Sequence, residues 1–270
     1  MLVNFSENER EFFKKIICDY NIRADGRDTL SIRSLEIKPE IIPSCFSSLK
    51  IKLVDSNKEI LFAIKADLLR IKSPAALEGI EFASISIDSM NKIENLKLKI
   101  EIEEFIRNLI LAKIDKNIFF VKNENKEITD FYWKLYIDVF IFDTIKISYL
   151  QVISLGIKQA LLNLKLPKLI FFKNEISGVS EFDLIENYKD VSETDKEVNL
   201  PFEAIPDILV FSLMNNVLYV DPSDEEEAIS NSIIIASKID KKLESIQSIG
   251  SAVDLNRIFD VTNIIKNFSL

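Results

Sequence analysis

Two groups of charged side chains are the residues of this sequence best suited to chemistry. Near the N-terminus, Arg23, Arg27 and Arg33 are three of only seven arginines in the chain. A guanidinium group is planar and binds a carboxylate or phosphate through two parallel hydrogen bonds, so the cluster favours an anionic partner. The simpler interpretation is a connection between a helix and a strand with solvated arginines, and both interpretations stay open.

The second group is acidic and extends from Asp221 to Glu227. Two carboxylates at this spacing have the chemistry of an acid/base pair or of metal ligands. The alternative is a solvated acidic turn that precedes a strand. The sequence contains no histidine, which excludes Ser-His-Asp and Cys-His catalysis and His-ligated zinc. Its two cysteines, Cys18 and Cys45, have no metal or redox spacing, so neither a metal nor a cofactor is expected.

Charge is distributed unevenly along the chain, whose net charge is −9. Residues 181–230 hold 14 acidic residues and two lysines, so the remainder is slightly positive. Binding to nucleic acid needs clustered Lys and Arg, so a role in RNA handling is expected to depend on more basic partners. The longest apolar run, residues 60–64, is far shorter than the roughly 20 residues of a membrane span. No secretory signal is visible, and no membrane partner is expected.

A helix is predicted before the arginine cluster, because Ser6 and Glu9 have the spacing of a capping box. Apolar residues follow at helical spacing over residues 12–20. Asp25 and Gly26 then predict a turn, since glycine has no side chain to clash at positive φ.

The remaining elements form two strand-rich halves, each closed by a helix, which predicts an α+β or mixed α/β fold, with α+β preferred. An antiparallel meander is predicted first, with strands at residues 31–38, 48–54, 59–67 and 80–87. Later strands are predicted near 117–122, 131–142, 169–172, 207–213, 217–220, 230–238 and 243–248, and helices at 100–114, 150–164 and 254–267. The chain is predicted to divide into a first domain (1–172), an acidic connection (173–199) and a second domain (200–270).

Several motifs follow one another along the chain: Arg23-Ala24-Asp25-Gly26-Arg27, Glu78-Gly79, Trp133-Lys134-Leu135-Tyr136-Ile137-Asp138-Val139, residues 160–167, and Val220-Asp221-Pro222-Ser223-Asp224-Glu225-Glu226-Glu227. Taken in this order, they resemble the RNase PH superfamily, and specifically the non-catalytic ring subunits of the eukaryotic RNA exosome. The resemblance implies the RNase PH fold, in which a unit like domain 2 of ribosomal protein S5 precedes a smaller C-terminal βα unit. It also implies a six-membered ring around a pore through which RNA passes.

Active members of that superfamily cleave RNA by phosphorolysis, and this sequence departs from them. In active members a Gly-Thr-Arg element between a strand and the following helix holds the attacking phosphate. Here residues 143–150 occupy that interval without Gly or Arg. No arginine lies between Arg70 and Arg107, where active members place another phosphate ligand. Lys146 offers a charge without the forked geometry of arginine. The departures imply a subunit that is not an enzyme.

The resemblance also assigns expected roles to individual residues. Asp221 and Glu227 fall where active members carry a pair of cleavage-site acids. They are interpreted as vestigial, and without a phosphate-binding element the solvated turn is favoured. In the alternative, an active phosphorolytic 3′–5′ exoribonuclease, they would act on RNA. A structural motif or subunit contact is expected for Arg23, Asp25, Gly26 and Arg27.

Partners and location follow from the resemblance alone. We expect other RNase PH-like ring subunits, RNA-binding cap subunits and RNA in the shared pore, in the nucleus (including the nucleolus) and the cytoplasm. The role would be 3′–5′ RNA processing and degradation, including rRNA maturation. The sequence assigns neither the RNA-binding residues nor one of the three inert paralogues (the ribosomal RNA processing forty-two, forty-three and forty-five types). A small-ligand domain of the wider S5-related class is the third interpretation, but nucleotide binding would need a glycine-rich loop that is absent.

Overall fold

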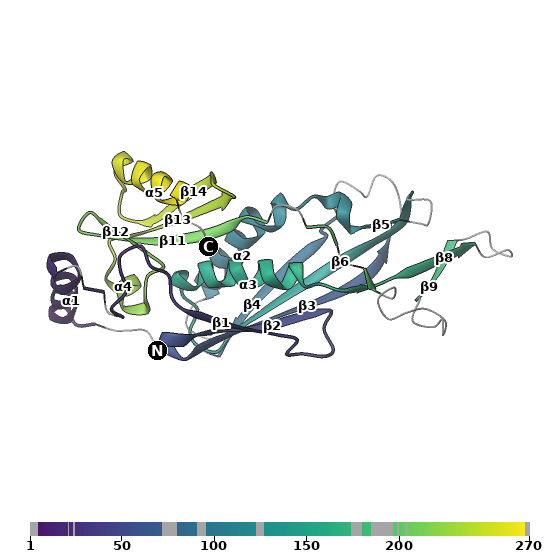
Figure 1. Ribbon diagram of the computed structural model, residues 1–270, viewed down its shortest axis with the longest axis horizontal. Helices are drawn as coiled ribbons and strands as arrows, with labels where there is room; N and C mark the ends of the chain where they lie inside the picture. Colours follow the sequence, from purple (N-terminus) through teal and green to yellow (C-terminus); the bar gives the residue numbers. More distant parts are fainter. Residues whose placement is uncertain are drawn as a thin grey trace.

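Two sheets enclose a layer of helices, and a further helix covers the outer face of one sheet (Figure 1). The structure is a computed structural model and describes residues 5–20, 22–23, 25–71, 80–90, 96–122, 127–173, 180–184, 197–198, 200–202 and 205–267. The predicted α+β fold class is confirmed. No helix in these ranges is long and apolar enough to span a membrane.

The first sheet has the strand order β1-β2-β3-β6-β4, and β5 pairs with part of β6. Its strands are β1 (Leu35–Pro39), β2 (Ser47–Leu53), β3 (Lys58–Arg70), β4 (Ala83–Ser89), β5 (Phe120–Lys122) and β6 (Ile128–Ile141). Alternate residues of β6 from Phe131 to Ile141 are buried, as expected for a strand with one face on a core.

The predicted antiparallel meander was wrong at its fourth strand. The second edge of β3 pairs with β6, from Ile60 opposite Ile141 to Arg70 opposite Phe131. β4 therefore adds to the far edge of β6, where it runs parallel. Parallel neighbours need a crossover, which helix α2 (Leu96–Leu109) supplies. The strand predicted near 117–122 was also too long, because Lys116–Phe119 (η4) is a 3₁₀ turn.

The second sheet is antiparallel, with the order β12-β11-β13-β14. Its strands are β11 (Asp207–Met214), β12 (Val217–Val220), β13 (Ser232–Ile239) and β14 (Lys242–Gly250). Asn215 and Asn216 join β11 to β12 with φ values of 43° and 66°, the backbone of a tight hairpin turn. Helix α5 (Leu255–Asn267) buries Val261 and Ile265 against the outer face of this sheet.

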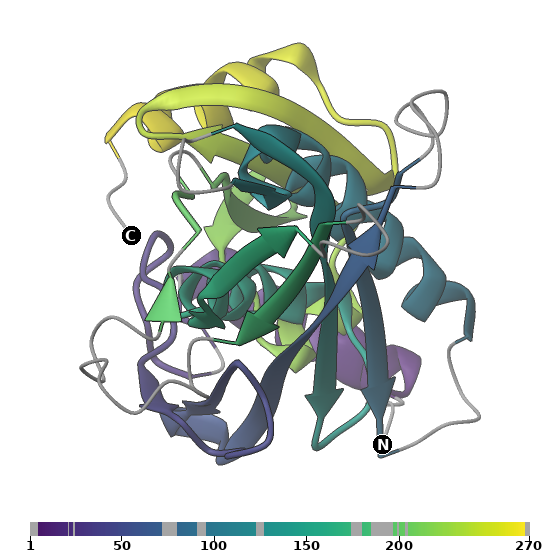
Figure 2. The same cartoon turned by 90° about the vertical axis from the view of Figure 1, so that its right-hand side faces the viewer.

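Helix α3 (Leu150–Leu162) is the centre of the molecule, because it packs against β2 and β3 on one side and β11 on the other. The main core accordingly contains residues from both predicted domains, Leu49 and Ile233 among them. Two short ribbons, β7 (Leu166–Pro167) with β10 (Glu197–Val198) and β8 (Leu169–Lys173) with β9 (Ser180–Leu184), complete the described strands. Figure 2 shows the β8–β9 ribbon as two green arrows in front of the sheet, near the centre of the view.

Close contact between α3 and the first sheet depends on one glycine of the helix, Gly156. A Cβ at Gly156 would lie 2.2 Å from the Phe62 ring. We expect Gly156→Val to lower the free energy of unfolding by about 1–3 kcal/mol or more through overpacking, measured by denaturant titration. The control is Leu162→Val, since Leu162 lies on the same helix and is 47% exposed. Equal stability of the two variants would contradict the prediction.

Candidate functional site

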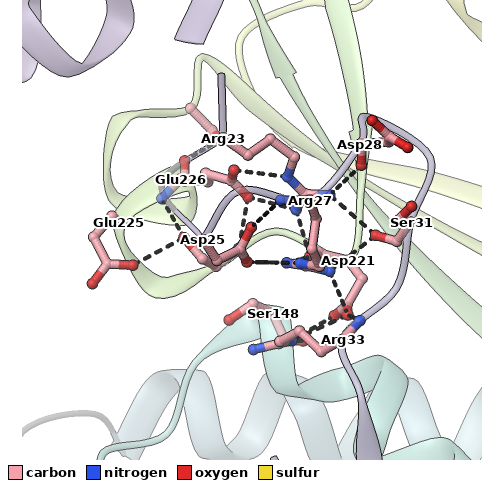
Figure 3. A network of polar contacts seen from close by, with 12 residues as sticks. Arg23, Asp25, Arg27, Asp28, Ser31, Arg33, Ser148, Asp221, Glu225 and Glu226 are labelled. Carbon is pink, nitrogen blue, oxygen red and sulfur yellow. Dashed lines mark hydrogen bonds and ion pairs between the residues drawn. The ribbon is translucent and has the colours of Figure 1, made fainter. Parts of the chain in front are cut away.

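The site lies where the N-terminal segment meets the second sheet and the start of α3. Helix α1 (Glu7–Tyr20) begins with the predicted capping box, in which the Ser6 backbone N–H donates to Glu9 at 2.8 Å. The predicted turn follows: the Gly26 N–H donates to the Arg23 carbonyl at 3.0 Å, and Gly26 has a φ of 76°. This turn directs both Arg23 and Arg27 towards the loop after β12 (Figure 3).

Arg23 is fully buried, and all five of its N–H donors are used. Its Nε and Nη2 form a bidentate pair with the Glu226 carboxylate at 2.9 and 2.7 Å. The other donors contact backbone carbonyls of Asp28 and Ser31, at 3.1 Å each, and of Asp221, at 2.9 Å. A guanidinium group with no solvent access and every donor paired serves as a structural cross-link.

Asp221 is the acceptor on which the other two arginines converge (Figure 3). Its carboxylate accepts bonds from the Arg33 side chain at 2.5–3.1 Å, the Arg33 backbone N–H at 2.7 Å and Arg27 Nη1 at 3.2 Å. Its carbonyl accepts bonds from the Nη2 atoms of Arg23 and Arg27, both at 2.9 Å. Asp221 has a φ of 51°, and its side chain is only 2% exposed. In this arrangement its carboxylate faces cations of the protein itself.

The acidic group is a short helix, α4 (Asp224–Ile229), and the prediction of a solvated turn was wrong. Ser223 is its N-cap, with the Glu226 N–H donating to Ser223 Oγ and the Ser223 N–H donating to the Glu226 carboxylate. Acids in a first helical turn are stabilised by the backbone N–H groups there. Ser223 and Glu226 have the capping-box spacing, so this signal was available in the sequence.

Glu227 lies on the side of α4 that faces the start of α3. Its Oε1 accepts the Ile147 N–H at 3.2 Å, and its Oε2 accepts the Ser148 N–H at 2.8 Å. Both donors belong to a 3₁₀ turn, η5 (Ile147–Tyr149), that continues directly into α3. The predicted pair Asp221 and Glu227 thus lies in one region, but each carboxylate binds protein donors.

A second ion cluster lies beside Glu227. Lys146 and Lys58 both contact the Asp224 carboxylate, and Lys58 Nζ is also 3.1 Å from Asp143. The Tyr149 hydroxyl donates to Asp143 at 3.0 Å. Lys146, the residue expected to offer a point charge, is buried within this cluster.

Protonation equilibria in the cluster follow from burial and ion pairing. Burial alone would raise the pKa of Asp224, but hydrogen bonds from Lys146 and Lys58 outweigh it and lower that pKa. For Asp143, burial is likewise outweighed by the Thr144 N–H and Lys58, so its pKa is lowered. Burial would lower the pKa of Lys58, yet the two carboxylates raise it. Burial raises the pKa of Tyr149, so its hydroxyl remains a donor.

Sequence reasoning missed much of this arrangement. It counted Arg33 without assigning a partner, and it assigned no role to Lys58, Asp143, Asp224 or Tyr149. Only three-dimensional proximity joins these residues, since Lys58 is 166 positions from Asp224. Within the described ranges no group of three or more metal-ligating side chains is found. Glu78 and Gly79, part of the resemblance, lie outside the described residues.

Comparison with known proteins identifies the fold. No family model and no curated protein sequence matches the chain. Solved structures do match: a chain of an archaeal exosome core has a TM-score of 0.67 and 19% identity, over 96% of this chain and 92% of that chain. A chain of the Archaeoglobus fulgidus exosome with RNA bound to the active site has a TM-score of 0.67 and 18% identity, over 96% and 93%. The protein therefore has the RNase PH-like fold of exosome core chains.

Removing the Asp221 carboxylate charge should destabilise the fold strongly. In Asp221→Asn the buried guanidinium group of Arg33 loses its counter-ion, and Arg27 keeps only its ion pair with Asp25, so we expect a loss of about 3–5 kcal/mol in unfolding free energy. Asp138→Asn is the control, because its ion pair with Lys65 is exposed and worth at most about 1 kcal/mol. Denaturant titration measures both. A loss no larger than that of the control would refute a structural role for Asp221.

Stability should depend on pH through the second cluster. Since the pKa values of Asp143 and Asp224 are lowered, their contribution is present above the unfolded pKa of about 4 and disappears as pH falls through the folded values. The pKa of Lys58 is raised, so its contribution is present below about pH 10 and is lost above its folded pKa.

The measurement is the difference in unfolding free energy between wild type and Asp224→Asn. We expect a constant difference between about pH 5 and 10 that shrinks towards zero in acid. Asp130→Asn, at an exposed pair with Arg70, should show little difference at any pH. A difference for Asp224→Asn that grows on acidification would contradict the prediction.

Proposed function

We propose that this protein is a catalytically inactive RNase PH-like ring subunit of an RNA exosome. In this role it binds other ring subunits and RNA-binding cap subunits, and it contributes to the wall of a pore that carries RNA. The assembly would support 3′–5′ RNA processing and degradation, including rRNA maturation, in the nucleus, nucleolus and cytoplasm. Among proteins with this fold, the sequence resembles the inert eukaryotic ring subunits, and this resemblance supports the proposed inactive role.

Two kinds of observation support membership of a ring. The fold matches chains of exosome cores over 96% of this chain. In addition, two motifs of the resemblance that are nearly 200 residues apart, the arginine run and the Asp221 loop, join in one buried network. The motifs are thus parts of one structural feature, which supports the resemblance.

Pairing of the local cations is the observation that carries the proposal of inactivity. Phosphorolysis needs positive groups that are free to hold an incoming phosphate. Here the Arg33 guanidinium binds Asp221, and Lys58 and Lys146 bind Asp224. Residues 143–150 also lack the Gly and Arg of the phosphate-binding element. These three cations face carboxylates of the protein itself, and Glu227 adds a further negative charge nearby.

An active exoribonuclease that uses Asp221 and Glu227 has less support. Asp221 accepts bonds from two arginines, and Glu227 accepts bonds from two backbone N–H groups. The Asp221 side chain is only 2% exposed and donors occupy both of its oxygens, so it has no room for substrate, and Glu227 has one backbone N–H on each oxygen.

Phosphorolysis and assembly are tested separately. We expect no phosphate-dependent release of nucleoside diphosphates from RNA, by the purified protein or by a reconstituted ring. Phosphate-dependent release that is lost in Lys146→Ala would instead favour the active enzyme. Asp221→Ala is unsuitable here, because its effect on the fold would also abolish activity.

For assembly, co-purification should recover RNase PH-like partners and RNA-binding cap proteins in equal stoichiometry with this chain. Recovery of a stable monomer alone, from cells that contain such partners, would overturn the proposed role in a ring.

A further inference from the structure

We propose that the free edge of β14 is a docking surface, to which a neighbouring subunit of the proposed ring adds an extended strand. The inference deepens the proposed function and rests on it. It assigns the contact to backbone hydrogen bonds along the second half of β14, residues 245–250.

The backbone of β14 has hydrogen-bonding groups that point away from its sheet. β14 is the last strand of the second sheet, and among the described strands only β13 pairs with it (Figure 1). The Ser251 N–H donates to the Asn231 carbonyl at 3.0 Å, so in this register every second residue before Ser251 bonds to β13. The N–H and C=O groups of Ile246 and Ser248 therefore face outward. A strand that docks there gains about four backbone hydrogen bonds.

Residues 245–250 carry none of the features that protect an edge strand. Their sequence, Ser-Ile-Gln-Ser-Ile-Gly, contains no charged residue and no proline. The irregularity of the β13–β14 ladder lies at its other end, at Ser237 and Lys238. Residues 247–250 are all exposed, although consecutive side chains of a strand point to opposite faces. A long, uncharged and exposed edge is a site of pairing with another chain.

Other edges of the two main sheets are protected. On β12, the Val220 N–H donates to the Thr29 carbonyl at 2.9 Å, so the N-terminal segment covers that edge. On β4, the Ile87 N–H donates to the Glu103 carboxylate of α2 at 2.8 Å. β1 has only five residues and ends at Pro39, which has no N–H to offer. The contrast indicates that the edge of β14 is covered by another chain.

The chemistry of this edge favours a permanent subunit over a transient peptide. A bare edge promotes aggregation whenever it is uncovered, so it suits a chain that remains in its assembly. Helix α5, which packs on β14, adds an apolar surface, because Leu255 and Phe259 are 69% and 66% exposed and lie one turn apart. Permanent interfaces are more apolar than transient ones. A neighbouring ring subunit is a partner of this kind.

Amide hydrogen exchange tests the pairing in wild type, both as the isolated chain and in a reconstituted ring. In the isolated chain the Gln247 and Ile249 amides should exchange slowly, because they bond to β13, and the Ile246 and Ser248 amides should exchange fast. In the ring we expect exchange at Ile246 and Ser248 to slow by at least about 100-fold. Unchanged fast exchange of these two amides in an assembled ring would overturn the inference and leave the proposed function intact.

Ser248→Pro is the matching variant, because it removes an outward N–H and no bond to β13. Proline is tolerated on an edge strand when its nitrogen faces solvent, so the variant should fold, which denaturant titration checks. We expect its affinity for the neighbouring subunit to fall at least about tenfold. Ser248→Ala is the control, since it keeps the N–H and should assemble like wild type. Equal assembly of folded Ser248→Pro and wild type would contradict the inference.

Two further outcomes separate this inference from the proposed function. Dimers of isolated wild type that Ser248→Pro converts to monomers would identify a second copy of this chain as the occupant and overturn the assignment to a ring subunit. Failure of wild type to join any ring would overturn the proposed function and the inference together. The exchange measurement needs no variant, so it decides the question even if Ser248→Pro does not fold.

Discussion

Pairing of buried arginines with Asp221 and Glu226 is the interaction on which the rest of the structure depends. A charge removed from water must be neutralised and fully hydrogen-bonded, so a buried guanidinium group constrains every segment that supplies an acceptor. Arg23 contacts residues as far as 203 positions away. Through Arg33, the network also reaches the Ser148 carbonyl at the start of α3, at 2.9 Å. One set of ion pairs thereby joins the N-terminal segment, the second sheet and the central helix.

The network consists of arginines, a residue type that is well suited to binding an anionic substrate. In this protein the arginines have a structural role. Arginine forks fit carboxylates as well as phosphates, and here carboxylates of the protein take that place. The second cluster repeats the pattern, with Lys58 and Lys146 bound to Asp224 and with Glu227 on the backbone donors of η5. A region with the residues of an anion-binding site is therefore filled by anions of its own chain. This self-pairing is the physical basis of the proposed inactivity.

Much of the fold was predictable because its signals are local. The α1 capping box, the turn at Gly26 and the strands near 131–142, 207–213 and 217–220 each depend on neighbouring residues, and all were found in the structure. The parallel position of β4 was not predictable in this way, because periodicity shows that a strand exists and not which edge it joins. For α4, four consecutive acids suggested solvation, although its capping box was present in the sequence.

The sequence by itself determined the types and positions of the charged residues, the absence of histidine, and the missing Gly and Arg between β6 and α3. Those facts limit the chemistry whatever the fold, since a side chain that is absent cannot act. Only the tertiary structure decided which charges meet. Ion pairing depends on distance in space and on the loss of water around each group, and neither quantity can be read from spacing along the chain. For that reason Asp221 and Glu227 could be selected from the sequence, while their partners emerged only from the fold. Those partners are the side chains of three arginines and the backbone N–H groups of Arg33, Ile147 and Ser148.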